Sequence, residues 1–460
     1  MELAGKHITV VGLGKTGQAL AGFLLHRGAV VTVSDSAPEQ SLGDVPGALR
    51  QAGVRVELGR HGPDVFENAD LIVLSPGVPH DIEPVRAARM AGVPVTGEIE
   101  LAARFITTPV VAVTGTNGKS TVTRLIGLML EKSGRSAFVG GNLGTPLISY
   151  ADGAQDADVV VAEISSFQLD TAETFHPEVG VLLNITADHL DRYPDLRAYG
   201  ESKAKLFSEQ TGGDTAVLNA ADPLVMELTE NINSRRCLFN SDAGGECRAW
   251  IDGSMINICT PDAGKAVIAG SDVFLPGRHN LENTAAAALA ALAAGANLKG
   301  VSDGLRDFNP DPHRMQWVAC INGVNYYDDS KATNVDAVAR ALEAMDPPVV
   351  LILGGRDKGG GYGGLAETIR RHAKALVVMG EAADTISREL GGIVETRRAL
   401  SMDEAVAEAG GLASEKGTVL LSPACASFDM YESYALRGED FQRAVLSLGS
   451  DGDGKQHGKK

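Results

Sequence analysis

The sequence has few cysteines and a shortage of basic residues, and both exclude classes of protein. Its five cysteines are scattered among 460 residues without a Cys-x-x-Cys pair. We therefore expect neither a disulfide framework nor a zinc site. The same scarcity of cysteine pairs fits a protein of a reducing compartment. Lys and Arg number 41 against 59 Asp and Glu, which gives a net charge of −18. Because nucleic acids and anionic membranes bind basic surfaces, neither is expected as the main partner.

Long apolar runs are also missing. No segment approaches the roughly eighteen apolar residues that a membrane-spanning helix needs. The N-terminus lacks the basic and apolar stretches of a signal peptide, and residues 7–13 are expected to form a strand instead. We therefore expect a cytoplasmic protein without membrane insertion, and a monomer.

Short Val/Ile/Leu runs alternate with helical patterns along the chain, which predicts an α/β fold with parallel sheets. The predicted strands are His7–Val11, Val30–Ser34, Leu71–Leu74, Val110–Thr114, Val159–Glu163, Val179–Ile185, Ala216–Asn219, Val349–Leu353, Ala375–Met379 and Thr418–Ser422. Turn-forming residues near 107–109 and 309–312 mark breaks between units. We predict a Rossmann-like domain at 1–106, a central P-loop ATPase-like domain with a parallel sheet at 107–310, a Rossmann-like domain at 311–448 and a disordered tail at 449–460.

A phosphate-binding loop is the most specific local signal. The strand at 110–114 runs into Gly115-Thr-Asn-Gly-Lys-Ser-Thr121 and then into a predicted helix at 122–132. Glycines let backbone N–H groups approach phosphate oxygens, the lysine neutralises their charge, and the serine hydroxyl can hold Mg²⁺. Only two residues separate Gly115 from Gly118, whereas the general P-loop has four between its glycines. A chance Gly-rich turn is the weaker interpretation.

A second glycine motif, Gly12-Leu-Gly-Lys-Thr-Gly17, follows the first strand and precedes a predicted helix at 18–27. Asp35 closes the next strand, where a dinucleotide site places its ribose-binding acid. Three interpretations stay open at this point: NAD binding, another nucleotide diphosphate, or glycines that serve only a tight turn.

Further polar residues follow predicted strands. Glu163 ends one strand and His189 follows another, so both are expected at the edge that carries the phosphate loop. With Ser120 they could converge on Mg²⁺, although a histidine taken alone is more often a surface or core residue. Asn283, in the box Gly277–Asn283 that opens an Ala-rich helix at 281–294, could bind a purine edge. Asn280 of the same box is an alternative for the purine contact, and helix capping by Asn280 explains the box equally well.

These pieces, in this order over nearly the whole chain, resemble the Mur ligase family. The run 115–121 resembles the shortened phosphate loop of that family. Segments 165–169, 184–193, 277–283, 313–314 and 329–334 resemble further family boxes. Within the family, segments 12–17, 75–77, 140–144 and 422–429 resemble members that add D-glutamate. Ser36-Ala37 departs from relatives that carry Thr-Arg there.

The resemblance implies ligands for many residues. ATP is expected at Gly115, Thr116, Asn117, Gly118, Lys119, Ser120, Thr121, Asn283, Arg314 and Asp329. The UDP-linked substrate, UDP-N-acetylmuramoyl-L-alanine, is expected at Leu13, Thr16, Asp35, Ser36, Gly77, Asn142, Ser165 and Gln168. D-glutamate is expected at Lys331, Thr333, Lys358, Ser427, Phe428 and Tyr434.

The resemblance also implies the chemistry. Lys119, Glu163, His189 and Lys203 are the expected catalytic residues. Two Mg²⁺ ions would be held by Ser120, Glu163, His189 and a carbamylated Lys203, with Lys205 as the alternative lysine. The expected reaction is an ATP-dependent amide ligation through an acyl phosphate, in peptidoglycan precursor synthesis. The third domain would close over it to exclude water.

Three alternatives remain at this point. An NAD-dependent oxidoreductase would use segment 12–35 but leaves segment 115–121 unexplained. A nucleotide-dependent switch protein would use the same phosphate loop without forming an amide. A ligase of the same family could add another amino acid.

Overall fold

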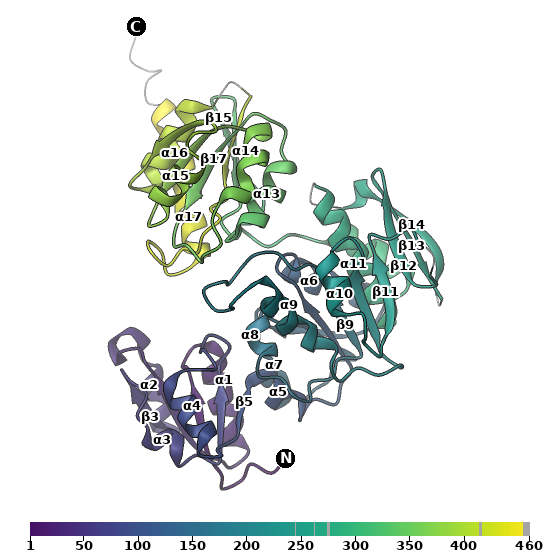
Figure 1. Cartoon of the computed structure of the whole chain (residues 1–460), viewed down its shortest axis with the longest axis vertical. Helices are drawn as coiled ribbons and strands as arrows, with labels where there is room; N and C mark the ends of the chain where they lie inside the picture. Colours follow the sequence, from purple (N-terminus) through teal and green to yellow (C-terminus); the bar gives the residue numbers. More distant parts are fainter. Residues whose placement is uncertain (244, 262, 274–276, 414–415, 454–460) are drawn as a thin grey trace. The chain divides into compact units, whose positions relative to one another are not determined.

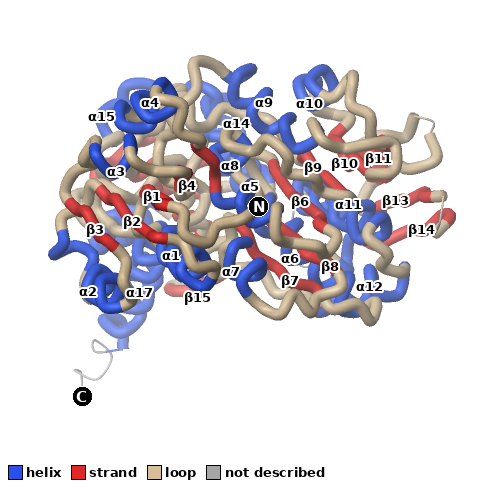
Figure 2. The backbone as a smooth tube through the Cα atoms, turned by 90° about the horizontal axis from the view of Figure 1, so that it is seen from below, coloured by secondary structure: helices blue, strands red, loops and turns tan. Residues whose placement is uncertain are grey.

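The structure is a computed structural model that describes residues 1–460 except 244, 262, 274–276, 414–415 and 454–460, and only the backbone of 450–453. The chain divides into two compact units. The first unit contains residues 1–184, 200–269 and 283–307, and the second contains 185–199, 270–282 and 308–460. Figures 1 and 2 label the elements along the chain. No helix among the described residues is long and apolar enough to cross a membrane.

The first sheet is parallel and has the strand order β3-β2-β1-β4-β5. Its strands are β1 (His7–Val11), β2 (Val30–Asp35), β3 (Arg55–Leu58), β4 (Leu71–Leu74) and β5 (Val95–Gly97). The helices are α1 (Lys15–His26), α2 (Val45–Gln51), α3 (Asp64–Glu67), α4 (Glu83–Met90) and α5 (Glu98–Ala103). The order reverses at β1, so the turn after β1 lies at the switch point where open sheets bind ligands.

The second sheet has nine strands in the order β14-β13-β12-β11-β10-β9-β6-β8-β7. Its parallel strands are β6 (Val110–Thr114), β7 (Ala137–Gly141), β8 (Val159–Glu163), β9 (Val179–Leu182), β10 (Thr215–Asn219), β11 (Arg235–Phe239) and β12 (Arg248–Asp252). The antiparallel strands β13 (Met255–Thr260) and β14 (Gly264–Ala269), which were not predicted, extend one edge (Figure 2). Strands β6 and β8 are buried along their whole length, as expected for central strands.

The helices that follow in the chain are α6 (Lys119–Lys132), α7 (Leu147–Asp152), α8 (Ser166–Leu169), α9 (Leu196–Ala204), α10 (Pro223–Leu228), α11 (Arg278–Ala293) and α12 (Leu298–Asp307). In α11 the segment from Ala285 to Ala291 is 0% exposed. A helix that is apolar on every side is stable only when it is buried on every side, and small alanines permit this.

The third sheet, in the second unit, has the order β15-β16-β20-β17-β18-β19, in which only β15 is antiparallel. Its strands are β15 (Gln316–Ile321), β16 (Val324–Asp328), β17 (Val349–Gly354), β18 (Ala373–Met379), β19 (Glu395–Arg398) and β20 (Thr418–Leu421). The helices are α13 (Val335–Glu343), α14 (Ala366–His372), α15 (Ala383–Leu390), α16 (Met402–Leu412) and α17 (Tyr434–Asp453).

Helices cover both faces of this third sheet. Val349, Leu351 and Leu353 of β17 belong to a core with α13, α14 and α15, whereas the alternate residues Val350 and Ile352 belong to a core with α16 and α17 (Figure 1). Successive side chains of the strand point to opposite faces of the sheet and therefore belong to two separate cores. The three α/β sheets confirm the predicted fold class.

Two of the sequence expectations differ from the structure as follows. Strand β9 ends at Leu182, not Ile185, because the chain turns there to meet the phosphate loop. Helix α17 continues to Asp453, so its backbone enters the segment 449–460 that was predicted as a disordered tail; residues 454–460 lie outside the described residues. The three boundaries between the four predicted segments stay predictions.

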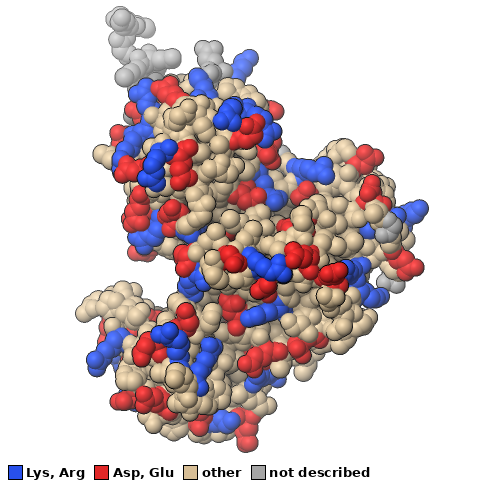
Figure 3. Space-filling view, in the orientation of Figure 1, with Lys and Arg blue, Asp and Glu red and all other residues tan. Residues whose placement is uncertain are grey.

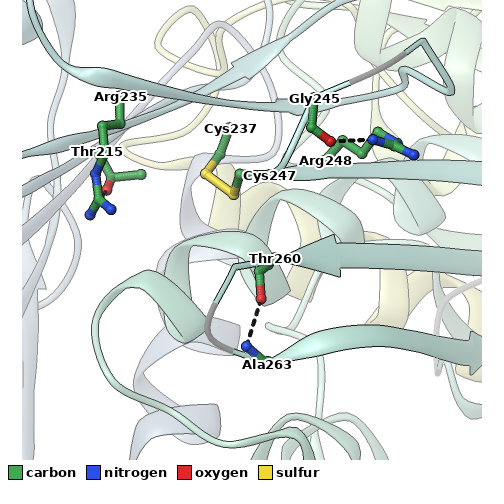
Figure 4. The surroundings of a disulfide bond; sticks show 8 residues. All are labelled: Thr215, Arg235, Cys237, Gly245, Cys247, Arg248, Thr260 and Ala263. Carbon is green, nitrogen blue, oxygen red and sulfur yellow. Dashed lines mark hydrogen bonds between the residues drawn. A yellow bond between two sulfur atoms is a disulfide. The ribbon is translucent and has the colours of Figure 1, made fainter.

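The expectation of no disulfide was wrong: Cys237 and Cys247 are bonded (Figure 4). Cys237 is the middle residue of β11 and Cys247 directly precedes β12, so the bond lies next to the register pair Leu238–Arg248 of these two strands. These strands share only the register pairs Leu238–Arg248 and Phe239–Ala249. The disulfide therefore fastens a short ladder through which β12 to β14 attach to the sheet.

Candidate active site

The phosphate loop connects β6 to α6 in the first unit. Gly115 and Gly118 both have positive φ, +153° and +90°. A Cβ on Gly115 would lie 2.9 Å from the Cβ of Leu183, and one on Gly118 would clash with the carboxamide of Asn283. Glycine is required at both positions because the backbone conformation and the close neighbours exclude a side chain. The same packing places the predicted ATP ligand Asn283 of α11 beside the loop.

Asn184 holds this loop in shape. Its carbonyl oxygen accepts from Thr116 N at 2.9 Å, and its Oδ1 accepts from Asn117 N at 2.8 Å. Its Nδ2 donates in return to the carbonyl of Asn117 at 3.1 Å. The residue that follows β9 by two positions therefore fixes the backbone from which phosphate would be bound.

Two lysines point toward the carbonyls of the loop. Lys119 Nζ donates to the carbonyl oxygens of Gly115 and Thr116, each at 2.8 Å. Lys203 is 1% exposed, and its Nζ donates to Gly115 O at 3.0 Å. Lys205 lies apart, with a side chain 45% exposed and its Nζ 3.8 Å from Asp170. Of the two candidates for carbamylation, Lys203 is the one beside the phosphate loop.

Glu163 lies at the same sheet edge, because β8 is the neighbour of β6 and Glu163 is in register with Val113. The side chain is buried, and its Oε1 accepts from Asn142 Nδ2 at 2.8 Å. Its other oxygen, Oε2, is buried without a hydrogen-bond partner. A buried carboxylate oxygen without a donor fits a cation ligand. Ser120, on the first turn of α6, is also buried.

Among the described residues, no group of three or more His, Cys, Asp or Glu side chains gathers into a possible metal site. The predicted magnesium ligands are of another kind, since they include a serine hydroxyl and a lysine carbamate. That ligand set stays a prediction.

In the first sheet, Leu13, Thr16, Ser36 and Gly77 follow β1, β2 and β4, which are adjacent strands, so they share one edge. The carboxylate of Asp35 supports this edge.

Both oxygens of Asp35 accept backbone N–H groups. Oδ2 accepts from Leu13 at 2.6 Å, and Oδ1 accepts from Ala37 at 2.7 Å. Asp35 therefore shapes the glycine turn.

Ser165 and Gln168 form a capping box at the start of α8. Gln168 Oε1 accepts from both N and Oγ of Ser165 at 2.9 Å. Behind them lies Glu98, whose carboxylate accepts from Ile148 N at 2.8 Å and from the Gln168 side chain. Burial raises the pKa of Glu98 to about 7. The two predicted substrate ligands are thus held by each other and by a buried carboxyl group.

In the second unit, a cavity of about 150 Å³ is lined by Asp188, Thr333, Asn334 and Lys358 among others. Lys358 Nζ lies 3.3 Å from Asp188 Oδ1 and 3.4 Å from Thr333 Oγ1. Asn334 Nδ2 donates to Asp188 Oδ2 at 3.0 Å. The structure therefore brings together the predicted D-glutamate ligands Thr333 and Lys358 around a carboxylate that was not predicted.

The other predicted D-glutamate ligands lie near the start of α17. Lys331 Nζ is 5.1 Å from the centroid of the Tyr434 ring and 3.9 Å from Asp311. Ser427 is buried, whereas Phe428 is 64% exposed. The Lys331 ammonium on the ring face is a cation–π contact.

Asp329 and Arg314, the predicted ATP ligands of the second unit, lie close to β16. Asp329 accepts from Ser422 Oγ at 2.9 Å and from Met315 N at 3.2 Å. Burial raises the pKa of Asp329 to about 7. Arg314 Nε is 3.7 Å from Asp311.

His189 also belongs to the second unit. It has a positive φ of 56°, and its Nε2 lies 3.8 Å from Asp188 Oδ2. A non-glycine residue in this conformation is uncommon and occurs often at functional sites.

Sequence reasoning missed Asn184, Asp188 and Arg437. Asn184 and Asp188 lie inside the segment 184–193 that was singled out, but the sequence does not reveal which residues they contact. Arg437 is 2% exposed on α17, and no sequence pattern distinguishes it from a surface arginine.

Comparisons with known proteins agree along the chain. Residues 6–97 match the description "Mur ligase MurD-like, N-terminal domain", 113–291 match "Mur ligase middle domain", and 313–425 match "Mur ligase, glutamate ligase domain". A protein of Desulfosudis oleivorans named UDP-N-acetylmuramoylalanine–D-glutamate ligase is 51% identical over 453 residues, which are 98% of each chain. A protein of Desulfatibacillum aliphaticivorans with the same name is 50% identical over 97% of this chain and 100% of its own.

Solved structures share the fold at low identity. The UDP-N-acetylmuramate-alanine ligase MurC of Thermotoga maritima has a TM-score of 0.59 and 20% identity, and covers 96% of this chain and 99% of its own. A pseudomurein peptide ligase type C of Methanothermus fervidus has a TM-score of 0.61 and 19% identity over the same shares.

Proposed function

Because the chain belongs to the Mur ligase family, we propose that it joins D-glutamate to UDP-N-acetylmuramoyl-L-alanine with ATP, in peptidoglycan precursor synthesis. The structural observation that carries this proposal is the phosphate loop with Lys119 and Lys203 at its carbonyls and Glu163 at the end of the neighbouring strand. Such an edge suits phosphoryl transfer to a carboxylate.

The reaction needs an activated acid, because a carboxylate has no good leaving group. The γ-phosphoryl group of ATP moves to the carboxylate of the muramoyl-alanine, which gives an acyl phosphate and ADP. The neutral amine of D-glutamate then attacks the acyl carbon, and phosphate leaves. The N-terminus of α6 and the ammonium of Lys119 would stabilise the charge on the transferring group.

Magnesium supplies charge neutralisation at the phosphates when it is bound. We assign Ser120, Glu163 and His189 as its ligands, with two ions in all. The buried and unpartnered oxygen of Glu163 supports this assignment. Lys203 is assigned as a carbamate, since a carbamate presents anionic oxygens where an ammonium would repel the metal. Its burial beside Gly115 supports this role.

The remaining assignments follow the edges described above. Asn283, Arg314 and Asp329 bind ATP together with the loop 115–121. The UDP-linked substrate binds at Leu13, Thr16, Asp35, Ser36, Gly77, Asn142, Ser165 and Gln168. D-glutamate binds at Lys331, Thr333, Lys358, Ser427, Phe428 and Tyr434. A cytoplasmic location and a monomeric state stay predictions.

The oxidoreductase alternative loses its basis. Segment 12–35 lies in the part of the chain that matches a Mur ligase N-terminal domain.

The test measures phosphate release with UDP-N-acetylmuramoyl-L-alanine, ATP and each of a panel of D- and L-amino acids. The proposal expects rapid release and an amide product with D-glutamate. Product formation with another amino acid alone would refute the specificity. Release without any amide would instead favour a nucleotide-hydrolysing switch.

A further inference from the structure

We propose that Arg437 is a positioning residue that sets the geometry of the D-glutamate site by holding three loops of the second unit together. The inference rests on the proposed function, because it concerns the amino acid that enters the reaction. Arg437 itself is not proposed to touch a substrate.

The guanidinium of Arg437 reaches all three loops at once. Its Nη2 donates to Ser330 O at 2.8 Å, and its Nε donates to Ser330 Oγ at 3.0 Å. Its Nη1 donates to Cys425 O at 3.1 Å and to Gly354 O at 3.4 Å. Ser330 follows β16, Cys425 follows β20, and Gly354 is the last residue of β17. These three strands are neighbours in the sheet.

Each of these loops carries a predicted D-glutamate ligand close in sequence to the contact. Ser330 directly precedes Lys331, Gly354 lies four residues before Lys358, and Cys425 lies two residues before Ser427. A change in the position of the guanidinium would therefore move three ligands relative to one another.

Tyr434 is tied to the same point. Ser330 Oγ, which accepts from Arg437 Nε, donates to the carbonyl oxygen of Tyr434 at 2.8 Å. The ring of Tyr434 in turn lies against the ammonium of Lys331. The start of α17 and the loop after β16 are thus fastened through one hydroxyl group.

The chemistry of arginine explains why this residue can do so. A guanidinium has five donors in a rigid planar fork, whereas a lysine ammonium is a compact point charge on a flexible stem. Burial lowers the pKa of Arg437 to about 10, so the group still carries its proton at neutral pH. Four hydrogen bonds to three carbonyls and one hydroxyl offset the cost of burying this charge.

A glycine makes room for the guanidinium. A Cβ on Gly355 would lie 3.1 Å from Arg437 Nη1, and Gly355 has a φ of +133°. The backbone after β17 can therefore pass close to the arginine only without a side chain at that position.

The consequence for catalysis concerns the second half of the reaction. The amine of D-glutamate must approach the acyl carbon from one face of its carbonyl group, and a displacement of about 1 Å in such a site costs on the order of 100-fold in rate. Formation of the acyl phosphate depends mainly on the phosphate loop of the first unit, and the carboxylate of the proposed ATP ligand Asp329 is held by Ser422 and Met315 rather than by Arg437. Loss of the guanidinium should therefore affect the amide-forming step and the KM for D-glutamate more than the phosphoryl transfer.

The experiment compares Arg437→Lys, Arg437→Ala and wild type in steady-state kinetics and in a partial reaction without D-glutamate, in which hydroxylamine traps the acyl phosphate. We expect kcat/KM for D-glutamate to fall on the order of 100-fold in both variants. Hydroxamate formation should stay within about threefold of wild type, because the two steps depend on different groups. Added guanidinium chloride should restore part of the amide formation in Arg437→Ala but not in Arg437→Lys, whose side chain still fills the site.

Arg443→Met is the matched control, since Arg443 lies on the same helix but is exposed and pairs with Asp403 and Asp440. It should leave both reactions unchanged. Equal losses of hydroxamate and amide formation in Arg437→Lys, or no loss at all, would overturn the positioning role. If the wild-type protein itself fails to use D-glutamate, the proposed function fails instead, which distinguishes the two results.

Discussion

The ammonium of Lys203 lies 3.0 Å from the carbonyl oxygen of Gly115, the glycine that opens the phosphate loop. Only 1% of Lys203 is exposed, although a lysine on a helix normally extends into water. A buried amine at this place is expected to serve the chemistry, and its carbamylation would turn a cation into an anionic ligand.

The first prediction concerns this lysine. Lys203→Ala should lower kcat on the order of 100-fold or more, because an electrostatic group beside the transferring phosphate is removed. Acetate or formate at high concentration should restore part of the activity by supplying the missing carboxylate oxygens. Initial rates with and without the added carboxylate measure the effect.

Lys205→Ala is the control for that experiment. Its ammonium lies near Asp170 at the surface, with 45% of the side chain exposed. The variant should keep wild-type activity and show no response to acetate. Full activity in Lys203→Ala, or rescue of the Lys205 variant instead, would contradict the assignment.

The second prediction concerns Glu163. Glu163→Gln keeps the oxygen that accepts from Asn142 but replaces the carboxylate by a neutral amide. We expect a higher Mg²⁺ concentration for half-maximal activity and a kcat lower on the order of 100-fold, because the metal loses an anionic ligand. A magnesium titration of the rate measures both. An unchanged magnesium requirement would show that the unpartnered oxygen serves another purpose.

The third prediction is a pH dependence of stability from Glu98. Its pKa is raised from 4.5 to about 7 in the folded protein, so folding binds the proton more tightly. Its contribution is fully present below pH 4.5 and is lost as the pH rises through 7. Between these values the carboxyl group should weaken the fold by about 3 kcal/mol, at ~1.4 kcal/mol for each pKa unit.

Glu98→Gln isolates this effect, because an amide cannot ionise and retains an acceptor for Ile148 N. The free energy of unfolding of the variant, minus that of wild type, should increase from pH 5 to pH 8. Urea titrations followed by Trp250 fluorescence in a Trp317→Phe background report the first unit, which contains Glu98. A pH-independent difference would mean that Glu98 ionises normally.

The fourth prediction concerns the disulfide. The bond joins two cysteines that are ten positions apart in the sequence (Figure 4). Both cysteines line a cavity of about 650 Å³. The free energy of unfolding of the double variant Cys237→Ser/Cys247→Ser should be about 2–3 kcal/mol lower than that of wild type, because the unfolded chain gains conformational entropy without the cross-link. Its activity should match wild type, because β9 and β10 separate β11 from β6, the strand that leads into the phosphate loop.

Calorimetry of the wild type with and without dithiothreitol provides the same comparison without mutation. Cys320→Ser, which changes an exposed free cysteine, should leave the transition unaltered. Equal melting temperatures for the oxidised and reduced proteins would show that the bond contributes nothing to the folded state.

The charge on the surface agrees with the composition. On the face seen in Figure 3, acidic and basic side chains are intermingled. The net charge of the chain is −18, and on this face the basic residues do not gather into one patch.

The phosphate loop could be predicted from sequence because local rules determine it. The apolar residues Val110–Thr114 form a strand with the predicted bounds, and glycines stand where the backbone has positive φ. The helix begins at Lys119, three residues earlier than predicted, because Ser120 and Thr121 join its first turn although they are weak helix formers.

Other features depend on contacts between distant segments and could not be predicted. The disulfide requires the pairing of β11 with β12, which their short ladder does not reveal in sequence. The role of Arg437 requires three strand ends to meet around it, and its bond to Ser330 spans 107 residues along the chain. The bonds of Asp188 to Asn334 and Lys358 span 146 and 170 residues. Sequence patterns indicate which residues are polar and where strands end, but not which partners they find.

The alanines of α11 have a consequence for how this protein can vary. Since the stretch from Ala285 to Ala291 has no exposed face, an added methylene group anywhere along it must displace a neighbour. The same helix carries Asn283 against Gly118. If Asn283 binds ATP as proposed, substitutions up to about two turns further along the helix should therefore change the affinity for ATP. Inhibitors that depend on the Asn283 contact would meet resistance mutations in this helix only at the expense of the enzyme's own use of ATP.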